Sequence, residues 1–105
     1  MNTKKKSDTI KFLDSLRGGP LTFGDLLRST RICDEISQAE LARLMHMSRS
    51  HLCDIENSRR TVSIEKAAEF AKVLGYSEHQ FVATLIEDQL RNAGMPFAVE
   101  LKKAA

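Results

Sequence analysis

Apolar side chains recur every three or four positions along most of the chain, which is the period of an amphipathic α-helix. Capping and helix-breaking residues divide this pattern into six segments. The predicted helices span residues 7–17, 22–31, 38–45, 48–57, 63–74 and 77–93. After residue 94 the period changes to two, because Met95, Phe97, Val99 and Leu101 alternate with other residues. The pattern therefore predicts an all-α fold, a compact domain of five to six helices with an extended C-terminal tail.

A serine or threonine precedes each predicted helix and can act as its N-cap, since its side-chain oxygen accepts from a free backbone N–H. These residues are Ser7, Thr22, Ser37, Ser48, Ser63 and Ser77. The segments 37–40 and 77–80 read as capping boxes. Glycines follow three of the helices, at Gly18, Gly75 and Gly94, where they are typical terminators.

The helical stripes also predict which side chains form the core. The predicted inward positions are Phe23, Leu26, Leu27, Leu41, Ala42, Leu44, Met45, Leu52, Ile55, Ile64, Ala67, Ala68, Ala71, Leu74, Phe81 and Leu85. Trp is absent and aromatic residues make up only 6% of the chain, so aliphatic side chains must supply most of this core.

The helices predicted at 38–45 and 48–57 are separated by only His46 and Met47. Two helices joined by so short a turn cross at a steep angle, which is the geometry of a helix-turn-helix. Ala42 is small enough for the second helix to pass over it, and Met47 fills the inside of the turn. Leu52 and Ile55 face the body of the domain, and the outward face of the second helix then consists of Arg49, Ser50, Cys53, Asp54 and Asn57. An outward helix face with an arginine near its N-terminus suits the major groove of DNA.

The stretch from Gln38 to Asn57 resembles the lambda-repressor-like (Xre-type) helix-turn-helix family, and the likeness extends over about residues 22–90. The resemblance implies that Arg49, Ser50 and Asp54 face the edges of bases. It implies that backbone phosphates are contacted by Gln38, Ser48, Asn57, Arg59 and Arg60, and that Gln38 also braces the reading helix. Phosphate contacts supply affinity and register, whereas base contacts supply specificity.

Four departures from the family pattern bear on these roles. His46 and Ser58 stand where glycine is usual, and a left-handed backbone at His46 would cost about 1 kcal/mol. The loop 32–36 is about one residue longer than usual. Asp54 brings a negative charge to the reading face, where it accepts from a cytosine amino group or weakens attraction to phosphate. The alternative for Asp54 is a surface carboxylate paired with Arg49 or Ser50.

Composition and charge then narrow the function. The 105 residues are enough for one domain, which we divide into an arm and short helix (1–21), the DNA-binding domain (22–93) and the tail (94–105). The net charge is +2, with +3 in residues 1–63 (11 basic, 8 acidic) and −1 in residues 64–105 (5 basic, 6 acidic). An anionic partner is therefore expected to meet the first half. Lys4, Lys5 and Lys6 are candidates for an arm that contacts DNA, or else a solvated tail.

Several other classes of protein are not expected. The basic N-terminus is not followed by an apolar segment of signal-peptide length, and no apolar run is long enough to span a membrane, so we expect a cytoplasmic protein. The spacing of His46, His51, Cys33 and Cys53 matches no zinc pattern, so we expect neither a metal nor another cofactor. No catalytic grouping is implied, and an enzyme is not expected.

A single reading helix covers few base pairs, so we expect a homodimer on a palindrome. Its predicted interface consists of Val82, Ile86 and Leu90 from the last helix with Phe97 and Val99 from the tail. The sequence thus predicts a dimeric repressor that reads double-stranded DNA. Two alternatives stay open. One is an antitoxin that binds a toxin through 1–21 and 95–105; the other is a protein-interaction domain without DNA binding, as the acidic Asp54 and Glu56 would favour.

Overall fold

The computed structural model describes residues 21–104, which form five α-helices and no strand. They are α2 (Phe23–Cys33), α3 (Gln38–Leu44), α4 (Arg49–Glu56), α5 (Ile64–Leu74) and α6 (Glu78–Asn92). The all-α fold is confirmed. The helix predicted at 7–17 and the arm residues Lys4, Lys5 and Lys6 lie outside the described residues.

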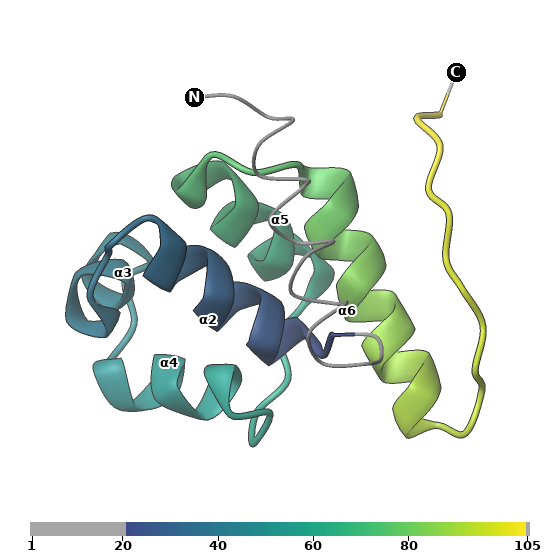
Figure 1. The fold of residues 1–105 in the computed structure, drawn as a ribbon, viewed down its shortest axis with the longest axis horizontal. Coiled ribbons are helices and arrows are strands. Elements are labelled where there is room, and N and C mark those ends of the chain that lie inside the picture. The colour runs from purple at the N-terminus through teal and green to yellow at the C-terminus, as the bar shows by residue number, and fades with distance from the viewer. Residues whose placement is uncertain (1–20, 105) are drawn as a thin grey trace.

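Helix α2 lies at the centre of the molecule (Figure 1), with α3 and α4 on one side and α5 and α6 on the other. It contacts α4, α5 and α6, while α5 and α6 form the most extensive helix pair. At Gly24 the backbone of α2 approaches the end of α4 so closely that a Cβ atom would lie 2.6 Å from the carbonyl oxygens of Ile55 and Glu56. Only glycine allows this approach, which places α4 directly against the central helix.

The helix boundaries follow from local chemistry, as predicted. Each described helix begins after a serine or threonine whose hydroxyl oxygen accepts from the backbone N–H three residues later, at 3.0–3.4 Å. Such a cap contributes about 1 kcal/mol to helix stability. These N-caps are Thr22, Ser37, Ser48, Ser63 and Ser77. Gly75 ends α5 in a left-handed conformation.

The core contains most of the predicted side chains, with three errors: Ala68 is only half-buried, and two larger side chains are exposed. Leu44 and Ile64 are 39% and 49% exposed. At about 100° per residue, the buried face of α3 is centred near Met45, so that Leu44 lies at its edge. Ile64 lies in the first turn of α5, at the edge of a buried face centred between Phe70 and Ala71.

Phe70 is fully buried although it was missing from the predicted core. Its ring lies 6.4 Å from that of Phe23, which is 6.1 Å from the ring of Phe81. Tyr76 continues the cluster at 5.8 Å from Phe81. Four of the six aromatic residues of the chain are thus concentrated where α2, α5 and α6 meet, and they join these helices into one core.

The residues after Gly94 run as an extended chain beside α6 (Figure 1). The backbone N–H of Val99 donates to Oε2 of Glu87 at 2.8 Å, which ties the tail to the helix. Phe97 is 64% exposed. The tail is extended as predicted, but its period of two does not correspond to a β-strand in the described chain.

The burial of Tyr76 makes the stability of the fold depend on pH. Burial raises the pKa of Tyr76 to about 12, from 10.0 for a free side chain. The phenol holds its proton more tightly in the folded protein than in the unfolded chain. The contribution of Tyr76 to the free energy of unfolding is therefore fully present below pH 10 and is lost as the pH rises from 10 to 12. Between about pH 8 and about pH 11, the wild-type free energy of unfolding should fall by about 1 kcal/mol more than that of Tyr76→Phe. Urea titrations at both pH values measure this; equal losses would contradict it.

Candidate nucleic-acid interface

A buried ion pair joins the helix-turn-helix to the central helix. Nε of Arg31 on α2 donates to Oε2 of Glu56 on α4 at 2.7 Å, and its Nη2 donates to Oε1 at 3.1 Å. The Glu56 side chain is 1% exposed. Arg31 also donates from Nη1 to the carbonyl of Ile36 at 2.9 Å, which holds the loop before α3. A two-pronged contact of this kind satisfies a buried carboxylate and fixes the relative orientation of the helices that carry it.

Gln38 extends this contact to the start of α4, the helix predicted to read DNA. Its Nε2 donates to Oε1 of Glu56 at 3.1 Å, and its Oε1 accepts from Nε of Arg49 at 3.3 Å. The side chain of Gln38 thus connects the buried pair to the first residue of α4. The resemblance implied such a brace, and the structure has it; the phosphate contact of Gln38 stays a prediction.

The turn between α3 and α4 is built as the sequence indicates. Ala42 is buried, and its carbonyl accepts from the N–H of Met47 at 3.0 Å. His46 has φ of 55°, the left-handed conformation expected where the family has glycine. Leu52 and Ile55 are buried against the body of the domain. These contacts turn the opposite face of α4 to solvent.

The outward face of α4 carries the residues predicted to contact DNA. Arg49, Ser50 and Asn57 are exposed, and Cys53 and Asp54 are half-buried between them. Apart from its bond to Gln38, the Arg49 side chain makes no hydrogen bond within residues 21–104. Both of its terminal nitrogens therefore remain available for a bidentate contact with a guanine.

The end of α4 is shaped by a reversal of the chain. Asn57 donates from Nδ2 to the carbonyl of Cys53 at 2.9 Å, and Ser58 follows with φ of 60°. The N–H of Arg59 then bonds the carbonyl of Asp54 at 2.8 Å. Nε of Arg59 lies 3.1 Å from Oδ1 of Asp54, and this hydrogen bond raises the pKa of Arg59. The alternative pairing of Asp54 with Arg49 or Ser50 is wrong, because the reversal at Ser58 places Arg59 beside the carboxylate.

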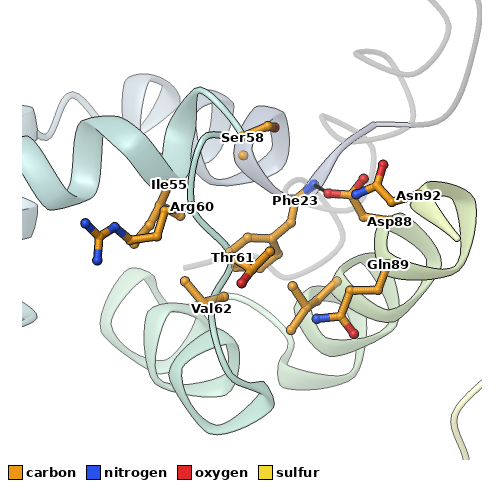
Figure 2. Close-up of a pocket in the computed structure, with 11 residues that line it drawn as sticks. Phe23, Ile55, Ser58, Arg60, Thr61, Val62, Asp88, Gln89 and Asn92 are labelled. Carbon is orange, nitrogen blue, oxygen red and sulfur yellow. Dashed lines mark hydrogen bonds between the residues drawn. The ribbon is translucent and has the colours of Figure 1, made fainter.

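One expectation about charge changes with this geometry. Glu56 was counted among the acidic residues that argue against DNA binding, but its charge is buried and paired with Arg31. The Glu56 carboxylate therefore adds no negative charge to the outward surface of α4. Arg60 is exposed. Figure 2 shows its guanidinium pointing away from the small cleft behind the loop 58–62.

The cleft behind this loop is too small to be a ligand site of any size. It encloses about 40 Å³ between the loop, the start of α2 and α6, and that volume suits a water molecule or two. Asp88 accepts from the N–H of Phe23 at 3.0 Å on its rim (Figure 2).

No group of three or more potential metal ligands occurs in the part of the chain that the structure describes. None of the helices in that part has both the length and the hydropathy of a membrane span.

Sequence reasoning missed the roles of Arg31, Glu56 and Gly24. A signal was present for the first two, since Glu56 lies four positions after Leu52 and Arg31 four positions after Leu27, on buried faces. A charged residue at such a position is a candidate for a buried pair. For Gly24 the sequence holds no comparable signal, because its role depends on how closely two helices approach.

The buried pair generates a prediction about stability. Arg31→Met leaves the Glu56 carboxylate buried without its partner and should lower the free energy of unfolding by about 3 kcal/mol. Adding Glu56→Leu removes the unpaired charge, and the double variant should lie within about 1 kcal/mol of the wild type. Arg28→Met, at an exposed position of the same helix, is the matched control and should change stability by less than about 0.5 kcal/mol. Urea unfolding measures all four proteins, and a double variant as unstable as Arg31→Met would contradict the argument.

Comparison with known proteins agrees with this geometry. Residues 34–81 match the model of a helix-turn-helix family. The search of curated proteins gives no significant match, and neither does the search of solved structures. The matched segment contains α3, the turn, α4, α5 and the start of α6. Residues 34–81 therefore form a helix-turn-helix domain of the lambda-repressor-like (Xre-type) family, a family of DNA-binding transcriptional regulators.

Proposed function

We propose that this protein is a cytoplasmic, sequence-specific repressor that binds double-stranded DNA as a homodimer and regulates its own gene. The observation that carries the proposal is the division of α4 into two faces. Its inner face, with Leu52, Ile55 and Glu56, is buried, and its outer face presents Arg49, Ser50 and Asp54. A helix of this form fits the major groove, where donors and acceptors distinguish all four base pairs.

The ends of α4 supply the groups that would hold the DNA backbone. Ser48 at the N-terminal end and Asn57 with Arg60 at the C-terminal end are exposed. Contacts at both ends would fix the register of the helix in the groove, and cations there add an affinity that depends on salt. Lys4, Lys5 and Lys6 remain candidates for an arm along the groove. In this proposal repression is by occlusion, because a dimer on a promoter blocks access of the polymerase.

The homodimer is supported by the apolar surface of α6. Val82, Ile86 and Leu90 are only half-buried by the chain itself. Phe97 is largely exposed, and Val99 is half-buried beside α6. Burying an exposed side chain such as Phe97 in a second subunit would contribute about 1.5–3 kcal/mol.

A titration with DNA tests the proposed function. Fluorescence anisotropy with DNA from immediately upstream of the gene, against a scrambled duplex, should give a complex at least about a thousandfold tighter for the upstream DNA. The affinity should fall steeply between two salt concentrations, because phosphate contacts release counterions. Equal, weak binding to both duplexes would contradict autoregulation. No binding at low salt would favour a protein-interaction domain.

The division of roles between bases and phosphates predicts two kinds of variant. Arg49→Ala should relax the preference at one base pair of each half-site by about 1–3 kcal/mol. Arg60→Ala should weaken binding to all sequences alike and reduce the slope of log affinity against log salt by about 1. Anisotropy titrations with the operator and its single-base variants distinguish the two effects. If both substitutions act alike, the assignment of roles is wrong.

The tail predicts a further result in solution. Deletion of residues 95–105 removes Phe97 and Val99 and should weaken the dimer, leaving the helical domain intact. Sedimentation equilibrium measures the mass, and circular dichroism checks the helix content. A truncated protein that dimerises as tightly as the full chain would exclude the tail from the interface.

A second candidate function is a DNA-binding antitoxin. The exposed apolar side chains of Met95, Phe97 and Leu101 favour it, because they lie outside the helical core and suit a protein partner. Co-expression with the product of the adjacent gene tests this function. A stable complex that inhibits the partner and is lost on deletion of residues 95–105 would support it; two separate elution peaks would contradict it.

A further inference from the structure

The structure distinguishes two neighbouring arginines for which the sequence predicts the same role. Within residues 21–104, Arg60 makes no side-chain hydrogen bond or ion pair. Arg59 is folded back onto the outward face of α4 by the left-handed conformation of Ser58. Its guanidinium contacts Asp54 through Nε at 3.1 Å and the thiol of Cys53 through Nη2 at 3.8 Å. The positive charge of Arg59 thus lies over the reading face.

The carboxylate of Asp54 needs such a partner if it is to face DNA. An unpaired carboxylate in the groove is repelled by the phosphates on both sides, whereas a carboxylate paired with a guanidinium carries little net charge. Asp54 is 33% exposed, so it is accessible to a base. Its Oδ1 is occupied by Arg59, and Oδ2 makes no hydrogen bond within the described chain. One acceptor atom of the pair therefore remains available.

The free oxygen of Asp54, Oδ2, determines which base it can bind. A carboxylate oxygen accepts hydrogen bonds and donates none when ionised. In the major groove, cytosine and adenine both present an amino donor, but the N7 acceptor beside the adenine amino group would repel the carboxylate, as O6 and N7 of guanine would. The pair thus favours a cytosine at the position that Asp54 faces.

We infer that Arg59 is a specificity-determining positioning residue, which acts by holding the Asp54 carboxylate so that its free oxygen accepts from a cytosine amino group. This inference rests on the proposed reading of DNA by α4, and it replaces the phosphate contact predicted for Arg59 from the sequence. Arg59 and Asp54 work as one unit, so that loss of the arginine removes a base preference as well as affinity.

Selection from a randomised library of DNA duplexes tests whether Arg59 and Asp54 together determine a base preference. The wild-type protein should enrich a motif with a cytosine at one position of each half-site. Arg59→Ala should lose that preference and bind the selected operator at least about fivefold more weakly, because the Asp54 carboxylate is then unpaired in the groove. Adding Asp54→Ala to Arg59→Ala should restore part of the affinity but not the preference. Arg60→Ala is the matched control and should weaken binding while it enriches the wild-type motif.

The outcomes separate this inference from the proposed function. If Arg59→Ala enriches the wild-type motif with uniformly weaker binding, as Arg60→Ala does, Arg59 contacts phosphate and the inference is wrong. Asp54→Ala alone completes the cycle of variants, and if its effect on affinity adds to that of Arg59→Ala in the double variant, the two residues do not act as a unit. If the wild-type protein enriches no motif, the proposed function itself fails. Thermal unfolding of each variant checks that the fold is retained, as expected for side chains outside the core.

Discussion

The contact between Arg31 and Glu56 is the interaction on which the arrangement of this domain depends. It lies where α2, α3 and α4 converge, and it buries a carboxylate that would be costly to leave without a partner. Burial of such a pair adds little net stability compared with apolar side chains, but breaking it is expensive. The pair therefore specifies how the helices fit together more than it stabilises them. Through Gln38 it also holds Arg49, so the position of a residue on the surface proposed to face DNA is tied to the core.

Helix α4 carries two acid–arginine pairs with different physical characters. Glu56 points inward and is 1% exposed, so its pair with Arg31 is shielded from salt and fixed in geometry. Asp54 points outward and pairs with Arg59, a contact that water screens and that contributes little to folding. If α4 binds DNA as proposed, a contact of little value for stability is free to exchange or share its partner with a base. The same chemistry thus serves structure on one face of the helix and is suited to recognition on the other.

The sequence predicted what depends on short-range chemistry. Thr22, Ser48 and Gly75 marked helix ends because capping involves residues three or four positions apart, and the short turn at His46 required steeply crossing helices. The errors lie where long-range packing decides. Leu44 was placed inside because the period alone does not show where a buried face ends. The partner of Asp54 was missed because it depends on a left-handed turn at Ser58, which places a residue five positions along the chain beside it.

The tail and a second subunit would compete for the same apolar face of α6. Leu101 and Val82 border the same gap between the tail and α6, so the chain's own tail lies along the helix face predicted to form the dimer. Beyond the backbone bonds of Gly94 and Met95 that close the end of α6, one described hydrogen bond joins the tail to the helix, from the N–H of Val99 to Glu87, and Phe97 gains little burial. A second subunit that covered these side chains would bury more apolar surface than the tail does alone, and burial of apolar area favours association. Dimer formation through α6 therefore requires the tail either to move from its own helix or to become part of the interface.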